Sequence, residues 1–112
     1  KHSFIHLGDT GYSDDFKNIY NKLGPVNLAA IPIGAYEPRW FMKFSHMNPE
    51  EAVMAFQDLK AEQAIGMHWG TFILTDEKVT EPPEKLEIAL SEKEIDLSKF
   101  ITLKHGQTFI LD

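Results

Sequence analysis

Three segments along the chain, rich in apolar residues, have the length and composition of β-strands. They cover residues 2–7, 28–33 and 64–68, and each is followed within two residues by a glycine. The middle run is apolar throughout, which is typical of a strand covered on both faces. Pro32 should lie at the end of that strand, because proline cannot donate to a sheet ladder. The pattern therefore predicts a sheet that contains these three segments.

Amphipathic segments between the apolar runs predict helices. The first should begin at Asp14-Asp15, with Ser13 as its cap and acidic side chains at the positive end of the helix dipole. Asn48-Pro49 is followed by two glutamates, which predicts a second helix that continues to about Ala61. The pair Pro82-Pro83 should open a third helix. Helices are thus expected to alternate with the predicted strands.

The last part of the chain has the pattern of a β-hairpin, in which apolar segments 100–103 and 108–111 flank turn-forming residues 104–107. The predicted element order is then β-α-β-α-β-α-β-β, which favours an α/β fold with a mixed sheet and flanking helices. Residues 34–47 show no regular period and are rich in large side chains. They are predicted to form a loop that does more than connect two elements.

Composition limits the classes of function. Seventeen acidic and eleven basic residues in a chain of 112 give a formal net charge of −6, which argues against a nucleic-acid surface and against polybasic attachment to anionic lipid. Because the chain has no cysteine, a metal site would need His, Asp or Glu. No apolar run approaches the roughly 20 residues of a membrane-spanning helix. The length fits one compact unit.

Two candidate functional residues stand where predicted strands end. Asp9 follows the first apolar run, and His68 closes the third. Ligands of open α/β sheets bind just outside the carboxyl ends of the strands, so these two side chains would meet at one edge if the strands are parallel. A carboxylate and an imidazole are ligands that zinc accepts. From spacing alone, however, a turn-capping aspartate and a histidine at the edge of the core are the simpler interpretation.

The remaining histidines differ in how well their positions suit a functional site. His46 precedes a predicted helix, which makes it a candidate third ligand, substrate contact or general acid/base, or else a histidine bonded to the backbone. His2 and His6 share one face of their strand but lie upstream of its carboxyl end, so packed or exposed positions are expected for them. His105 belongs to a predicted turn and is expected at the surface. The aromatic run 40–44 is either an apolar mouth for a lipid or a loop folded over the core.

Several longer motifs resemble those of N-acylphosphatidylethanolamine-hydrolysing phospholipase D and its bacterial relatives, which belong to the metallo-β-lactamase fold superfamily. The resemblance is to the carboxyl-terminal half of that family and runs in the same order over essentially the whole chain. It is carried by the segments Gly8-Asp9-Thr10-Gly11-Tyr12, Ile31-Pro32-Ile33-Gly34-Ala35-Tyr36-Glu37-Pro38-Arg39-Trp40-Phe41-Met42, His46-Met47-Asn48-Pro49-Glu50-Glu51-Ala52, His68-Trp69-Gly70-Thr71-Phe72 and Glu81-Pro82-Pro83.

The resemblance implies an αββα sandwich that holds two zinc ions, of which this chain would supply one half. Asp9 takes the position of an aspartate that bridges both metals in the family, and His68 takes that of a histidine that binds one of them. His46 takes the position of a histidine near the substrate phosphate. Asp9 and His68 are therefore the implied metal ligands, and Asp9 and His46 the implied catalytic residues.

The implied reaction is metal-assisted hydrolysis of a phosphodiester, which releases N-acylethanolamine and phosphatidic acid from N-acylphosphatidylethanolamine. Besides His46, substrate contacts are expected from Tyr36, Arg39 and Trp40 of the aromatic loop, which would form a lip for acyl chains. The implied partner is thus a phospholipid or another phosphodiester. Peripheral contact with a membrane is compatible with the lack of a spanning segment.

One departure from the family bears on activity. The family's first metal motif, His-x-His-x-Asp-His, belongs to its amino-terminal half, and no His-x-His occurs in this sequence. We therefore expect residues 1–112 to be the carboxyl-terminal part of a hydrolase domain that by itself binds zinc weakly and is inactive. Half of a sandwich also leaves a sheet face or edge uncovered, which predicts self-association or contact with a second chain.

Two other functions remain compatible with the sequence. The first is a hydrolase of the same fold that acts on a different ester, lactone or phosphodiester. The second is a non-catalytic α/β interaction module, in which Asp9 and His68 are only residues at the edge of the sheet. A metal site that joins these two residues would argue against the second.

Overall fold

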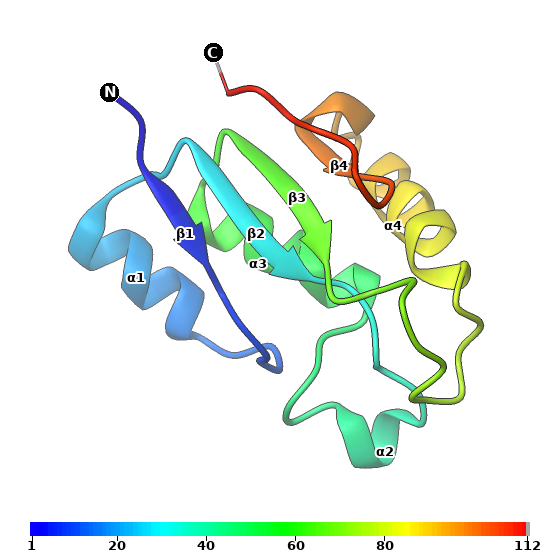
Figure 1. Ribbon diagram of the computed structural model, residues 1–112. Helices are drawn as coiled ribbons and strands as arrows, with labels where there is room; N and C mark the ends of the chain where they lie inside the picture. Colours follow the sequence, from blue (N-terminus) through cyan, green and yellow to red (C-terminus); the bar gives the residue numbers. More distant parts are fainter. Residues whose placement is uncertain (112) are drawn as a thin grey trace.

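A computed structural model describes residues 1–111 of the chain and shows alternating strands and helices (Figure 1). The first part of the prediction is confirmed, because a strand, a helix and a second strand follow one another before the aromatic loop. In order, the elements are β1 (Phe4–His6), α1 (Asp15–Leu23), β2 (Leu28–Pro32), α2 (Arg39–Met42), α3 (Pro49–Leu59), β3 (Gln63–Met67), α4 (Glu81–Glu92), the 3-10 turn η1 (Leu97–Lys99) and β4 (Phe100–Thr102).

The four strands form one sheet in the order β1-β2-β3-β4, and every pairing in it is parallel. In the register of the sheet, His6 lies beside Ala30, Ala30 beside Ile65, and Ile65 beside Ile101. The predicted α/β class is confirmed, whereas the predicted mixed sheet is not. All carboxyl ends of the strands meet at one edge, which is the geometry that brings Asp9 and His68 together.

The C-terminal hairpin prediction is wrong. The expected turn is present, because the Gln107 amide donates to the Lys104 carbonyl at 2.9 Å, but residues 108–111 form no strand. The physical reason lies upstream. Helix α4 carries the chain back along the sheet, so β4 runs parallel to β3, and β4 is only three residues long, which leaves few positions for a further strand to pair with.

The core fills the space between one face of the sheet and the helices. Its strand residues alternate, as the two-residue period requires, and include Ala29, Ile31, Ala64 and Phe100. Helix α3 lies behind the sheet in Figure 1, with α1 and α4 on either side of it. The residues of the opposite face, such as His6 and Ile65, are outside this core. In the described part of the chain, the helices therefore cover one sheet face only.

Helix ends agree with the sequence prediction in one case and differ in another. Asn48 caps α3 in a capping box, in which its side chain accepts from the Glu51 amide at 2.8 Å. The first helix has Asp14 rather than Ser13 at its N-cap position, and the Ser13 hydroxyl accepts from the Asp15 amide instead. Within residues 1–111, no helix combines the length and the apolar character needed to cross a membrane.

The segment between β2 and α3 was expected to be a loop throughout, but it contains the one-turn helix α2. Predicted helix and strand ends are otherwise displaced by one or two residues. Helix α3 ends at Leu59 rather than Ala61, and β3 ends at Met67, so that His68 is the first residue beyond the strand. This shift places the imidazole outside the sheet ladder, where it is free to bind other groups.

Candidate functional site

Three segments that are remote in sequence meet at the carboxyl edge of the sheet. Asp9 follows β1, His46 precedes α3, and His68 follows β3. One ligand atom from each of these side chains lies within 4.8 Å of the other two. The Nε2 atom of His68 is 3.3 Å from Oδ1 of Asp9, and the rings of His46 and His68 stack with centroids 5.3 Å apart. We call Asp9, His46 and His68 the edge cluster.

Local backbone geometry explains how His68 reaches this position. The β2–β3 ladder continues for one more bond, from the Ile33 amide to the Met67 carbonyl at 3.0 Å. His68 then adopts a φ of 64°, which turns the chain away from the strand. Gly34 lies so close to this turn that a Cβ atom built on it would be 2.1 Å from the His68 carbonyl oxygen. A side chain at position 34 would displace the His68 backbone.

The environment of His46 favours the neutral imidazole. Burial lowers the pKa of His46 below its ordinary value, the adjacent His68 lowers it further, and the Asp9 carboxylate opposes both effects. Its Nδ1 atom is also the buried side-chain nitrogen or oxygen that finds no hydrogen-bond partner within residues 1–111. A neutral imidazole with an unpaired nitrogen can bind a metal ion or accept a proton.

The donor set of the edge cluster fits a zinc ion. Two imidazoles and one carboxylate are hard or borderline ligands of the kind that zinc binds when no cysteine is present. Asp9 is largely exposed, with 65% of its side-chain surface accessible, so its oxygens remain open to a ligand beyond His68. The Nδ1 atom of half-buried His46, which is itself buried and has no hydrogen-bond partner within residues 1–111, is a further nitrogen donor at this site.

The three further residues expected to contact substrate occupy different environments. Tyr36 is only 3% exposed, and its hydroxyl donates to Glu81, so it points into the protein. The Arg39 guanidinium donates to the carbonyls of Tyr36 and His46, both at 3.1 Å, and forms an ion pair with Glu51. Trp40, by contrast, is 77% exposed. Tyr36 and Arg39 therefore shape the loop that carries His46, while Trp40 remains available at the surface.

The other histidines lie where the sequence suggested. His2 and His6 are exposed, and the Nδ1 atom of His6 accepts from the Gly8 amide at 3.1 Å. His105 is exposed in a turn, with its Nε2 atom 3.1 Å from the Thr71 hydroxyl. They do not belong to the edge cluster.

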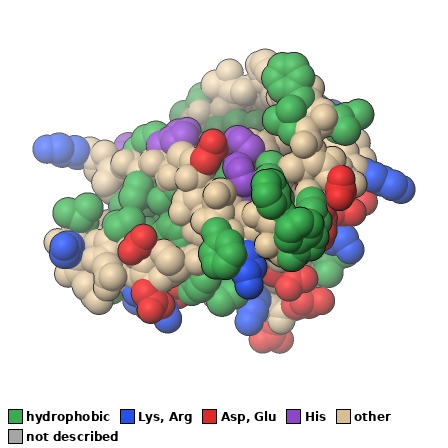
Figure 2. Space-filling view, turned by 90° about the horizontal axis from the view of Figure 1, so that it is seen from below, with side chains coloured by type: hydrophobic (Ala, Val, Ile, Leu, Met, Phe, Trp, Pro, Cys, Tyr) green, Lys and Arg blue, Asp and Glu red, His purple; other side chains and the backbone are tan. Residues whose placement is uncertain are grey.

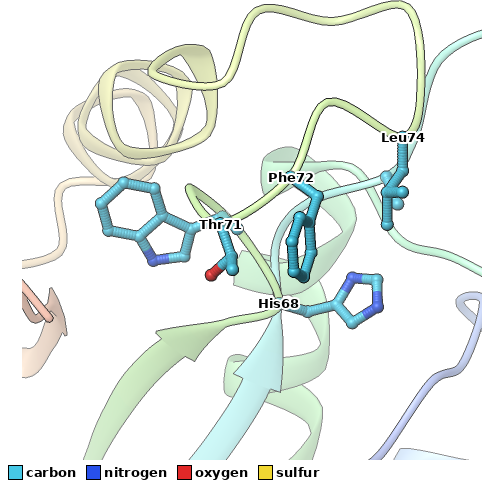
Figure 3. Close-up of a pocket in the computed structure, with 6 residues that line it drawn as sticks. His68, Thr71, Phe72 and Leu74 are labelled. Carbon is cyan, nitrogen blue, oxygen red and sulfur yellow. The ribbon is translucent and has the colours of Figure 1, made fainter.

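An apolar cavity of about 220 Å³ opens beside His68. Figure 3 shows the side chains of Phe72 and Leu74 pointing toward the His68 imidazole from the loop that follows β3. Sequence reasoning did not single out this loop as a cavity wall. The sequence feature that could have indicated the cavity wall is the run of apolar residues 72–74 after Gly70, which belongs to no predicted strand or helix.

Exposed apolar side chains border the edge cluster on two sides. Figure 2 looks onto this edge and shows histidines next to an acidic side chain, with apolar groups around them. Two segments supply the exposed large apolar residues near the cluster, and we call them together the apolar rim: Trp40, Phe41 and Phe44 from α2 and its end, and Phe72, Ile73 and Leu74 from the loop after β3.

A comparison with known protein families shows to which superfamily this chain belongs. The family model described as "Beta-lactamase superfamily domain" matches residues 1–69, which is more than half of the chain and includes all three residues of the edge cluster. The chain belongs to the beta-lactamase superfamily. The expected relationship to metallo-β-lactamase-fold proteins is thereby confirmed.

Individual relatives narrow the relationship within the superfamily. The chain is 49% identical over 107 residues to N-acyl-phosphatidylethanolamine-hydrolyzing phospholipase D 1 of Caenorhabditis elegans, a match that covers 93% of this chain and 30% of the relative. It is 46% identical over 86 residues to the mitochondrial enzyme of that name from Saccharomyces cerevisiae, over 75% of this chain and 18% of the relative. The chain thus spans less than a third of the length of these relatives.

A solved structure supports the fold. Igni18, described as a novel metallo hydrolase from the hyperthermophilic archaeon Ignicoccus hospitalis, superposes on this superfamily member with a TM-score of 0.61 and 26% sequence identity. The match covers 91% of this chain and 37% of Igni18. The parallel sheet and its flanking helices therefore correspond to part of a larger metallo-hydrolase.

Proposed function

We propose that the complete protein is a zinc-dependent phosphodiesterase that converts N-acylphosphatidylethanolamine to N-acylethanolamine and phosphatidic acid. The observation that carries the proposal is the edge cluster, in which one carboxylate and two imidazoles converge within 4.8 Å at the carboxyl end of a parallel sheet. The names of the two relatives that share 46–49% of their aligned residues with this chain supply the substrate class.

Each residue of the edge cluster has a proposed role. Asp9 and His68 would hold zinc, which when bound supplies Lewis-acid stabilisation of the charge that develops on a phosphoryl oxygen. His46 would lie against the substrate phosphate as a neutral imidazole, because burial and the neighbouring His68 lower its pKa. The Asp9 carboxylate lies 3.3 Å from His68 Nε2, so the two proposed ligand groups already converge. Arg39 would act on His46 indirectly, through the His46 carbonyl that it binds.

The apolar rim suits the acyl chains of a phospholipid. Its members include Trp40 and Phe44, which are 77% and 80% exposed, and no carboxylate occurs between residues 38 and 49 or between residues 68 and 75. Lys43 lies within the first of these segments, with its ammonium 5.1 Å from the centre of the Phe44 ring. Apolar groups with a nearby cation match a lipid that has an anionic headgroup, and such a rim permits peripheral contact with a membrane.

A second candidate is a hydrolase of the same superfamily with a different substrate, such as a carboxylic ester, a lactone or another phosphodiester. It is favoured by the 34% identity of this chain over 84 residues to a protein named "UPF0173 metal-dependent hydrolase" from Nitratidesulfovibrio vulgaris. That name specifies a metal-dependent hydrolase without a substrate. The edge cluster fits either reaction, whereas the apolar rim and the names of the more similar relatives support the phospholipid as substrate.

A substrate panel tests this proposal on the complete, zinc-loaded protein. We expect hydrolysis of N-acylphosphatidylethanolamine to exceed that of short carboxylic esters and lactones by at least about 100-fold in kcat/KM, since binding of the acyl chains contributes only to the lipid reaction. Removal of zinc with a chelator should abolish the activity, and added zinc should restore it. Preference for an ester or lactone would establish the second candidate, and no hydrolysis of any class would leave a non-catalytic module.

A further inference from the structure

The carboxylate of Glu77 is the meeting point of four hydrogen bonds. Its Oε2 atom accepts from the Ala35 amide at 2.8 Å and from the Thr75 hydroxyl at 2.7 Å. Its Oε1 atom accepts from the amides of Tyr36 and Glu37 at 3.2 and 2.9 Å. Three consecutive backbone amides of one loop thus bind a single side chain from another. We call this arrangement the Glu77 clasp.

The clasp joins two segments that are not paired by the sheet. Residues 33–38 follow β2, and the loop after β3 carries the apolar wall of the cavity before it reaches Glu77. A further bond, from the Asp76 amide to the Glu37 carbonyl at 3.2 Å, runs alongside. Burial opposes ionisation of Glu77, but the bonds from Thr75 and the backbone amides outweigh it and lower the pKa of this carboxyl. The side chain is therefore an anion at neutral pH.

The conformation that the clasp holds is an uncommon one. Ala35 has a φ of 63°, in the left-handed region that residues with a Cβ atom seldom adopt. This turn points successive amides toward one site, where an anion can satisfy all of them. Without an acceptor there, amides that are part-buried would lose their hydrogen bonds. Glu77 thus stabilises the backbone conformation of residues 35–37 by accepting hydrogen bonds from their amides.

That backbone path leads directly to the edge cluster. Gly34 packs against the His68 carbonyl at the close approach described above, and Ala35 and His68 line the same cavity. Phe72 and Leu74, from the loop that bears Glu77, close the cavity from the other side and point toward His68 (Figure 3). One carboxylate consequently anchors both walls between which the His68 imidazole lies.

We propose that Glu77 is a positioning residue: by binding the amides of residues 35–37 it fixes the backbone that packs on His68, and so sets the direction of the His68 imidazole and the width of the apolar cavity. The part of this inference that concerns zinc rests on the proposed function, whereas the part that concerns the imidazole does not. Glu77 itself does not touch substrate in this assignment.

The test compares Glu77→Gln with wild type in the complete protein. Glutamine retains one acceptor oxygen, but its NH₂ group would face the Ala35 amide, so at least one bond of the clasp becomes a contact between two donors. With the histidine rings isotopically labelled, we expect the NMR ring signals of His68 and of the stacked His46 to shift in the metal-free protein. Zinc affinity, measured by competition with a chelator, should fall by about 10-fold to 100-fold.

Three further variants separate positioning from a general loss of stability. Glu87→Gln removes the same charge from an exposed position on α4 and should leave both readouts unchanged. Thr75→Val removes one donor of the clasp and should shift the ring signals in the same direction as Glu77→Gln but less far, while Thr75→Ser should restore them. This pair also serves as the test if Glu77→Gln does not fold.

The outcomes distinguish this inference from the proposed function. Lowered melting temperature with unchanged ring signals and unchanged zinc affinity would show that Glu77 only stabilises the loops, and would overturn the inference. If the wild-type protein binds no zinc, the proposed function fails, and the ring signals of the metal-free proteins still decide the role of Glu77.

Discussion

Replacing Asp9 with alanine in the complete protein should reduce phosphodiesterase activity by more than about 1000-fold, the order of loss seen when a member of a catalytic unit is removed. Asp9 is the one carboxylate among the three ligand side chains of the edge cluster. Without it, zinc would lose a charged ligand, and the His68 imidazole would lose the carboxylate that lies 3.3 Å from its Nε2 atom. The measurements are kcat/KM for N-acylphosphatidylethanolamine and the zinc content of the purified variant.

The effect of Asp9→Ala should be confined to the site. Asp9 is largely exposed, and its contact with His68 is a surface pair, so the melting temperature should change little. Asp15→Ala is the matched control, because it removes an exposed carboxylate from the first turn of α1. That variant should retain wild-type activity and zinc. Full activity of Asp9→Ala would refute the proposed metal site, and equal losses in both variants would point to folding instead.

The second large effect is expected from the 112-residue chain studied by itself. It offers the two proposed zinc ligands, Asp9 and His68, and contains no His-x-His pair. We expect its zinc affinity to be weaker than that of the complete protein by more than about 100-fold, because loss of an outer-shell partner alone costs about 10-fold to 100-fold. Phosphodiester hydrolysis by this chain should be undetectable. Calorimetric zinc titration and a phosphodiesterase assay at equal molar concentrations provide the comparison.

Far-UV circular dichroism of the isolated chain is the control for that comparison, since a folded spectrum excludes denaturation as the reason for inactivity. The variant His105→Ala adds a second control. His105 lies outside the edge cluster, so weak zinc binding that depends on His105 would be adventitious. Hydrolysis by the isolated chain at a rate near that of the complete protein would contradict the proposed dependence on the His-x-His-x-Asp-His motif.

The placement of Asp9 and His68 could be predicted because it depends on few physical rules. Apolar runs marked the buried strands, and right-handed crossovers made neighbouring strands parallel, so residues just beyond the strand ends had to share one edge. The same kind of reasoning gave a wrong prediction for the C-terminal hairpin. Two apolar segments around a turn suggest pairing, but they do not show how long the first strand is, and β4 has only three residues with which a partner could pair.

Side-chain directions in the irregular segments could not be predicted. Tyr36 and Arg39 were expected to face substrate, yet their polar groups bind Glu81, Glu51 and backbone carbonyls. The role of Glu77 could not be predicted either, because four donors that converge from two separate segments leave no periodic signal in the sequence. Such contacts depend on where the loops meet in space, and that is fixed by the packed elements beneath them.

The left-handed backbone conformation of His68 lowers the stability of the fold but places an imidazole in the edge cluster. This conformation costs an L-residue about 1 to 2 kcal/mol, whereas glycine adopts it without steric penalty. The chain therefore has an imidazole at a position where a residue without a side chain would have the lower steric energy. The variant His68→Gly should therefore relieve this backbone strain while it removes one of the two proposed zinc ligands.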